Sequence, residues 1–286
     1  MIEVNSFAEL RTTMPSKPGE IAVLKRYYDK DSSFRGGGDF VGFTGTTILK
    51  DDGGTVAIGN GFYWKRSIND PREVNILHFG AKGDGVTDDT DAFKRILGWS
   101  QTYSQNMKGL PVRFPGGRFL IMPMDLSNAE IPFFGLAGDD LALGSLPGTT
   151  IVSDKSANTL FKVQARRTTI RGITWDGQAT ADTVTNTATI TPEMCSNVQP
   201  FFENSCMAGQ IVNISCFRGQ RSGGTIFKLQ DTLDSKFEQI YTNTTYSRVF
   251  DIGWSGSPNG VWDHSTAVEL CNANFQTGYG DATLYM

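Results

Sequence analysis

Apolar residues recur in two short patterns over the second half of the chain. The first alternates apolar and polar positions around a phenylalanine, at residues 160–163, 201–204, 226–229 and 249–252. The second has apolar residues at spacings of three and then two, at residues 170–175, 211–216, 237–242 and 270–275. Alternation with a period of two predicts β-strands. The sequence therefore predicts a set of similar strands separated by turns and loops.

The spacing between the two patterns indicates how these strands are arranged. From Phe161 to Ile173 it is the same as from Phe202 to Ile214, and from Phe227 to Ile240 it is one position longer. In the last repeat, from Phe250 to Ala273, it almost doubles, which predicts an insertion after Ile252. A nearly constant spacing within repeats of variable length is typical of solenoid coils with inserted loops.

Stacked coils also place the polar positions of the first pattern above one another. These positions alternate in charge: Lys162, Glu203, Lys228 and Asp251. The simpler interpretation is an exposed ladder of opposite charges, each pair worth roughly 0.2–1 kcal/mol. The alternative is that Glu203 or Asp251 is a functional carboxylate held by its lysine neighbours.

A glycine-rich stretch, FGAKGDGVTDDTDAF at residues 79–93, precedes the repeats. Residues 74–79 predict a short strand before it. Thr87 is the expected N-cap of a helix, with acids in or beside the first turn, where the helix dipole favours them. The glycine spacing is not a dinucleotide fingerprint, and no Gly-Lys-Ser/Thr follows, so nucleotide binding is disfavoured. The stretch predicts a loop and an amphipathic helix.

Residues 1–72 differ from the rest and predict a compact, mainly β module. Expected strands are 21–24, 39–43, 55–58 and 62–66, with Asp51–Gly54 as a hairpin turn and 69–72 as a linker. We therefore expect three parts: a small β-rich domain at 1–72, a strand, glycine loop and helix at 73–110, and coils at 111–286. The chain stops where another coil would begin, so we expect the coils to be truncated at the C-terminus.

Two resemblances follow from these motifs. The stretch at 79–93 resembles the start of right-handed parallel β-helices of the pectate-lyase and polygalacturonase-like superfamily, where such a segment leads into a helix that closes the end of the solenoid. The order LRTTMPSKPGEIAVLKRYY, GGGDFVGF, DDGGTVAI and GFYWKR resembles the small domain before the β-helix of many bacteriophage tailspikes. The resemblance implies an all-β fold, a right-handed parallel β-helix with an N-terminal capping helix.

Composition narrows the function classes. The net charge is −4, with 26 basic and 30 acidic residues and no basic block, which argues against nucleic-acid binding. No apolar run approaches the roughly 18 residues of a membrane span, and the N-terminus lacks a secretory signal. The four cysteines, 195, 206, 216 and 271, have no metal-ligand spacing, so we expect buried free thiols and no metal or cofactor.

Glycan chemistry needs carboxylates and rings at the right places. A hydrolase needs two carboxylates about 5–5.5 Å apart for retention or about 6.5–9.5 Å for inversion, and coils about 4.8 Å apart permit either distance. The insertion after Ile252 supplies suitable groups, so our catalytic candidates are Asp251, Asp263 and Glu269. Our candidates for substrate binding are Trp254, Trp262, His264, Asp176 and Glu238. The alternatives are that the tryptophans pack against the body or a sister chain, and that Asp176 is a turn residue.

The combined resemblance implies a tailspike that binds and depolymerises a bacterial surface polysaccharide, as a hydrolase or a lyase. The family implies a homotrimer, other phage tail proteins as partners, a location in the virion after synthesis in the host cytoplasm, and action at the bacterial surface. Part of the site is expected in coils beyond this chain. The alternative is a non-catalytic receptor-binding or structural spike segment, and an esterase is the third class, although no Gly-x-Ser-x-Gly elbow occurs.

Overall fold

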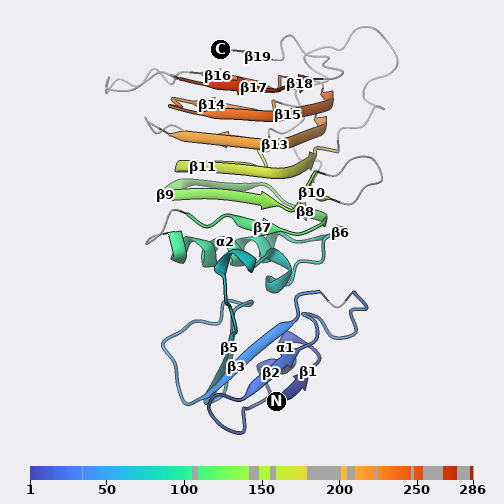
Figure 1. Cartoon of the computed structure of the whole chain (residues 1–286), viewed down its shortest axis with the longest axis vertical. Coiled ribbons are helices and arrows are strands. Elements are labelled where there is room, and N and C mark those ends of the chain that lie inside the picture. The colour runs from blue at the N-terminus through green and yellow to red at the C-terminus, as the bar shows by residue number, and fades with distance from the viewer. Residues whose placement is uncertain are drawn as a thin grey trace.

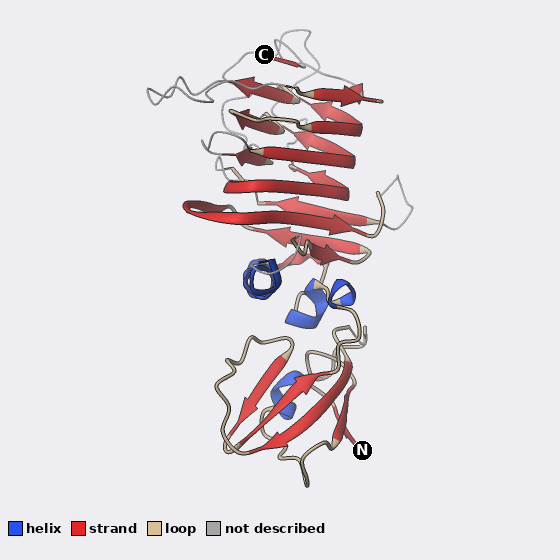
Figure 2. Ribbon diagram, turned by 60° about the vertical axis from the view of Figure 1, so that its left-hand side comes forward, coloured by secondary structure: helices blue, strands red, loops and turns tan. Residues whose placement is uncertain are grey.

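The computed structural model describes residues 1–33, 35–104, 109–141, 148–154, 159–178, 201–204, 210–222, 225–245, 248–253, 267–275 and 284–285. A small sheet lies at the N-terminal end, and a tall stack of strands rises from helix α2 (Thr90–Ser104) toward the C-terminus (Figure 1 and Figure 2). The chain thus forms a parallel β-helix preceded by a small, mainly β domain.

The small domain is a mixed sheet of five strands in the order β1-β2-β3-β5-β4. Its elements are β1 (Ile2–Val4), α1 (Phe7–Leu10), β2 (Ile21–Leu24), β3 (Gly38–Thr44), β4 (Val56–Gly59) and β5 (Phe62–Arg66). The four strands expected from the sequence are therefore confirmed within a residue or two. Its own core is built around Phe7, Phe40 and Trp64, each fully buried.

Two of the expected turns and strands differ. Residues 74–79 form no strand, because η1 (Pro71–Glu73) is followed by a second 3-10 helix, η2 (Ile76–Phe79), in which Asn75 caps the N-terminus. Residues 51–54 are not a hairpin turn, because β3 pairs with β5, not with β4. The carboxylate of Asp52 instead accepts the backbone N–H groups of Gly54, Thr55 and Val56.

Helix α2 closes the end of the coiled body, as the amphipathic pattern predicts (Figure 2). Its Phe93 ring lies 5.8 Å from the ring of Phe114 and 5.3 Å from that of Phe161, and all three are fully buried. The N-cap prediction was wrong. The backbone N–H of Thr90 donates to Asp88, whereas the hydroxyl of Thr87 is turned back to Asp84. Local Asx-type bonding within the glycine loop engages Thr87 before the helix begins.

The body is a stack of parallel strands that bend around three faces. Its strands are β6 (Asp84–Asp88), β7 (Val112–Phe114), β8 (Gly117–Ile121), β9 (Met124–Gly138), β10 (Thr149–Ser153), β11 (Phe161–Asp176), β12 (Phe202–Asn204), β13 (Ile211–Ser222), β14 (Phe227–Gln230), β15 (Lys236–Thr245), β16 (Phe250–Gly253), β17 (Glu269–Cys271), β18 (Asn274–Phe275) and β19 (Leu284–Tyr285). Long strands such as β11 pass from one face to the next without leaving the sheet.

The faces are defined by which strand segments pair. The first face stacks residues 124–126, 161–163, β12, β14, β16 and β19. The second stacks β7, residues 131–137, 165–171, 211–215 and 236–238, and β17. The third stacks β6, β8, β10, residues 174–176, 217–222 and 240–245, and β18.

The first face confirms the predicted ladder. Phe161, Phe202, Phe227 and Phe250 are register partners on successive coils, and all are buried. Their outward neighbours keep the predicted order of charges, and Asp125 adds one more acid before Lys162. Lys162 lies 3.9 Å from Asp125, and Lys228 lies 3.8 Å from Glu203. These side chains are partly exposed, which fits the simpler interpretation of an exposed charge ladder.

The register of the second pattern differs in one coil. Ile173 is paired with Phe217, and Phe217 with Ile240, so the partner of Ile173 is not Ile214. The true counterpart, Phe217, lies three positions further along the chain than the sequence pattern predicts. Ile211 and Ile214 have the same spacing of three as Ile214 and Phe217, and the apolar pattern alone cannot separate the two alignments.

A column of left-handed residues marks the corner between the second and third faces. Gly172, Cys216, Gln239 and Asn272 have φ values of 65°, 49°, 55° and 51° and occupy equivalent positions on successive coils. Glycine adopts this conformation without strain, and asparagine tolerates it better than most residues. The corner thus occupies the same register position on each of these coils.

Candidate functional site

The described catalytic candidates lie on different faces of the body. Asp251 belongs to β16 on the first face, where Arg248 approaches its carboxylate to 3.4 Å. Glu269 begins β17 on the second face and is exposed. Asp263, Trp254, Trp262 and His264 lie outside the described residues. Asp251 and Glu269 are therefore not paired with each other across neighbouring strands.

Glu269 instead shares the second face with Glu238, one coil earlier. Lys236 is the register partner of Glu269, and Glu238 is the partner of Cys271. Lys236 also lies 3.4 Å from Glu238, and the Cys271 thiol donates to Glu269 across 2.9 Å. Hydrogen bonding to Glu269 raises the pKa of Cys271. Two carboxylates on adjacent coils are thus brought to one surface, with a lysine between them.

Cys216 and Cys271 are free, as expected, but both are partly exposed rather than buried. Cys195 and Cys206 lie outside the described residues. Among the described residues no group of three acids, histidines or cysteines could hold a metal ion. The described helices include none that is long and apolar enough to cross a membrane.

Asp176 is the most enclosed of the described acids on the third face. Its carboxylate is 1 % exposed and is held by Arg118 from two coils below, at 3.0 Å, and by Arg221, whose Nε donates across 2.8 Å. Burial alone would raise the pKa of Asp176, but hydrogen bonds from Arg221, the Gln178 backbone and Arg118 outweigh it and lower the pKa. Asp176 is therefore held as an anion and joins neighbouring coils.

A groove of about 480 Å³ lies on the third face. Its side chains come from three successive coils and from the segment after β9. Arg218, Tyr241 and Asn274 are register partners, and Tyr241 is 40 % exposed. The remaining lining residues are Asp140, Leu141, Cys216, Gln239, Thr242 and Asn243. A ring, a guanidinium, amides and one carboxylate within a groove are groups that can hold a sugar by its ring face and hydroxyls.

The sequence patterns did not identify this groove. Arg218 and Tyr241 lie outside the apolar positions, and they face each other only in the correct register. No sequence signal marks this column, because Cys216 and Gln239 are not residue types that favour the left-handed backbone of the corner. Aligning Gly172 with Cys216 and Gln239 brings Thr174, Arg218 and Tyr241 into one column.

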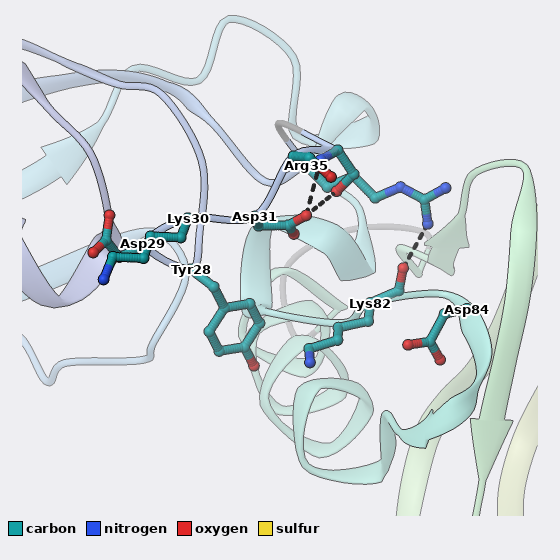
Figure 3. A pocket seen from close by; sticks show the side chains of 9 residues that line it. Tyr28, Asp29, Lys30, Asp31, Arg35, Lys82 and Asp84 are labelled. Carbon is teal, nitrogen blue, oxygen red and sulfur yellow. Dashed lines mark hydrogen bonds between the residues drawn. The ribbon is translucent and has the colours of Figure 1, made fainter.

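A second hollow lies where the small domain meets the glycine loop (Figure 3). It is lined by Lys30, Arg35 and Lys82 and by three acids, Asp29, Asp31 and Asp84. The charges balance, and several groups already have partners. Arg35 donates to the Lys82 carbonyl at 2.5 Å, and Asp31 accepts from both the backbone N–H and the hydroxyl of Ser33. The hydrogen bond from Arg35 to Lys82 thus links the small domain to the glycine loop at this hollow.

Comparison with protein families gives two matches. Residues 3–70 match the "phage tail protein small four-stranded beta-sheet domain". Residues 73–286 match the "rhamnogalacturonase A/epimerase, pectate lyase-like" family. The second match covers most of the chain.

Two individual relatives align with nearly the whole chain. The amylovoran biosynthesis protein AmsF of Erwinia amylovora is 38% identical over 96% of this chain and 34% of its own length. The structure of Pantoea stewartii WceF, described as a glycan biofilm modifying enzyme with a bacteriophage tailspike-like parallel β-helix fold, is 34% identical. That structure has a TM-score of 0.79 and covers 98% of this chain and 38% of WceF. The chain thus spans a little over a third of these relatives.

More distant structures share the fold. The tailspike gp49 of Acinetobacter baumannii phage Fri1, described as a capsular polysaccharide depolymerase, is 13% identical with a TM-score of 0.53. It covers 96% of this chain and 54% of gp49. The prediction of a tailspike-like, capped parallel β-helix is confirmed.

Proposed function

Since the chain belongs to the rhamnogalacturonase A/epimerase, pectate lyase-like family, we propose that it is a tailspike-type enzyme that binds and depolymerises a bacterial surface polysaccharide. Its relatives include proteins described as glycan-modifying enzymes and capsule depolymerases. The observation that carries the proposal for this chain is the groove on the third face. Register stacking holds Arg218, Tyr241 and Asn274 in line, so a polymer can contact several coils at once.

The carboxylates differ in the roles they can take. Asp176 is held as an anion by two arginines, which suits positioning and does not suit proton donation. Glu238 and Glu269 lie on adjacent coils, where carboxylates can reach the separations that glycosidases use. Asp251 directly precedes the insertion after Ile252 and Asp263 lies within it, and we retain both as catalytic candidates. Trp254, Trp262 and His264 are retained as candidates for sugar contact.

The test is product analysis on purified capsule or exopolysaccharide. New reducing ends would indicate a hydrolase, absorbance at about 230–240 nm from a new unsaturated uronate would indicate a lyase, and released acetate would indicate an esterase. Absence of any product from the assembled protein on its own host's glycan would overturn the enzyme proposal.

Variants then locate the site. Glu269→Gln, Asp251→Asn and Asp263→Asn test the acids, and a catalytic carboxylate should lower kcat about 100-fold or more. Tyr241→Ala should raise KM with a smaller change in kcat, because a stacking platform binds substrate and transition state alike. Asp125→Asn is the matched control for Asp251→Asn, since Asp125 lies on the same first face at the far end of the charge ladder.

A binding role without cleavage is the second candidate. It is favoured by the ion pairing of the described acids, since Asp176, Glu203, Asp251 and Glu238 each form an ion pair with a basic side chain. Retention of polysaccharide without any product, lost in Tyr241→Ala, would support it. We also propose a homotrimer, which the resemblance to tailspikes implies. We further propose that it is carried with other proteins of a phage tail, which the match over residues 3–70 supports. Light scattering after size exclusion tests the trimer.

A further inference from the structure

A cavity of about 770 Å³ lies between the small domain and helix α2, away from the groove on the third face. It is lined by the end of α1, Tyr27, the segment 49–56, Lys65 of β5 and one side of α2. Of its described lining residues, five are cationic (Arg11, Lys50, Lys65, Lys94 and Arg95) and two are acidic (Asp51 and Asp52). This lining therefore has a net charge of +3, whereas the whole chain has a net charge of −4.

The two acids of this cavity already have partners. Asp51 receives both Nε and Nη2 of Arg11 at 2.7 Å, and Asp52 accepts backbone N–H groups of the segment that follows it. Lys50 and Lys65 form no ion pair within the described part of the chain, and both are exposed at the rim. A charge imbalance of this kind favours an anionic ligand.

Helix α2 has a glycine, Gly98, where it lines the cavity. Lys94, Gly98 and Thr102 are four residues apart, so they share the side of α2 that lines the cavity. A Cβ atom added to Gly98 would meet no atom within 4 Å. A glycine inside a helix costs about 0.5–1 kcal/mol relative to alanine, and packing does not explain this one. Gly98 therefore leaves open space at this position, which a larger side chain could fill.

The side chains that line the cavity favour an acidic peptide over an acidic sugar. The groove on the third face presents amide side chains and an exposed ring, as sugar recognition requires, whereas the described lining of this cavity has no Asn or Gln side chain. Its rings are already packed, since Trp99 is 8 % exposed and Tyr27 stacks on Phe7 at 5.1 Å. Next to the cavity the chain exposes two aliphatic residues, Ile48 fully and Leu49 by 38 %. Lysines beside exposed aliphatic side chains suit a peptide with both acidic and apolar residues.

We propose that this cavity is a docking site for an acidic peptide segment of a partner protein, with Lys50 and Lys65 pairing with its carboxylates and Leu49 contacting an apolar side chain. The site is independent of the glycan groove and of the proposed enzymatic activity.

The test uses the full chain and a fluorescein-labelled peptide of alternating Glu and Leu, followed by fluorescence polarisation at low salt. The same peptide with Gln in place of Glu, oligogalacturonate of equal charge, and inorganic phosphate are the comparison ligands. We expect the acidic peptide alone to bind well, with an affinity that falls as salt is added, because exposed charges are screened. Equal binding of the Gln peptide, better binding of oligogalacturonate, or no binding of the acidic peptide would overturn the proposal.

Variants of the cavity make the test specific. The double change Lys50→Gln with Lys65→Gln should weaken binding about tenfold, whereas Lys162→Gln on the first face should leave it unchanged. Gly98→Ala should bind like the parent protein and melt at a slightly higher temperature. Gly98→Trp fills the cavity and should abolish binding. Full binding by a folded Gly98→Trp protein contradicts the proposal, and if that variant fails to fold, unchanged affinity of the double lysine variant does so.

Discussion

Phenylalanine rings repeat from coil to coil in the body. At the junction, where Gly36 and Gly54 of the small domain approach residues 77–79, each contact occurs once. On the first face Phe227 stacks on Phe250 with ring centroids 5.2 Å apart, and the same column continues through Phe202 and Phe161. On the small-domain side of the junction, by contrast, Arg66 alone donates to the carbonyls of Gly36, Gly37 and Gly54. The two regions are stable for different reasons.

The two regions should differ in how much stability a single substitution removes. In a solenoid each coil contacts only its neighbours, so a lost contact weakens one interface of several similar ones. The hydrogen bonds of Arg66 belong to no repeated unit, so no equivalent contacts remain when they are lost. The close approach there also depends on Gly54, since a Cβ atom at this position would lie 2.4 Å from the Phe79 ring. Single substitutions should therefore test whether repetition really protects the body.

The largest effect is expected where the body packs against the capping helix. Phe161 contacts Phe93 of the capping helix, Phe134 of the previous coil and Phe201 of the next. Phe161→Ala should lower the free energy of unfolding by about 3–5 kcal/mol, the usual cost of removing a buried ring. Urea unfolding measures it. Phe43→Ala, which removes a partly exposed ring of the small domain, is the control, and an equal loss in both would contradict the prediction.

Arg66 should be the most sensitive residue on the small-domain side of the junction. Its side chain is buried, and burial lowers the pKa of its guanidinium to about 10. Arg66→Met keeps most of the apolar volume but leaves three carbonyls without their donor, which should cost about 2–4 kcal/mol. Arg72→Met removes an exposed guanidinium paired with Asp70 and should cost little. Thermal unfolding of both variants separates a buried donor from a surface ion pair.

The sequence predicted the repeated region better than the junction, for a physical reason. A column of phenylalanines leaves the same pattern in every coil, so several weak signals support one interpretation. In the junction, each sequence signal occurs only once, so no second signal supports or corrects its interpretation. Thr87 looks like an N-cap, but Asp84 engages its hydroxyl, and residues 74–79 have the alternation of a strand but form a capped 3-10 helix.

The site was harder to predict than the fold. Its residues occupy outward positions, where the apolar pattern carries no information, and they meet only when the register is known. The shift of three positions at Phe217 moves Arg218 onto the column of Tyr241. Asp176 and Glu238 were identified as candidates from the local sequence. The partner of Asp176, Arg118, comes from another strand. The partner of Glu238, Lys236, lies two positions earlier on the same strand, where both side chains face the same side.

The glycine loop offers a pH-dependent test of the junction. Asp89 is buried there and accepts the backbone N–H groups of Lys82 and Gly83 at 2.7 and 3.0 Å. Burial nevertheless raises the pKa of Asp89 to about 6. A raised pKa in the folded state favours the protonated acid. Its contribution to stability is therefore complete below the unfolded pKa of about 3.9 and is lost as the pH rises through about 6.

Asp89→Asn should remove this part of the pH dependence. Between about pH 4 and pH 7 the parent protein should lose on the order of 1–3 kcal/mol through this residue, and the variant should not. Urea unfolding at several pH values measures the difference. Identical pH profiles of parent and variant would show that Asp89 does not titrate in this range. Asp125→Asn, an exposed acid of the charge ladder, is the control.

The smallest effect is expected on the outer side of the first face. Lys228 lies 3.8 Å from Glu203 and is 43 % exposed, so water screens the pair and the side chain gives up conformational freedom to form it. Lys228→Ala should change the free energy of unfolding by less than about 0.5 kcal/mol. A loss as large as that from breaking a buried pair, about 3 kcal/mol, would show that the charge ladder stabilises the coils directly, because the cost of losing a surface ion pair does not reach that value.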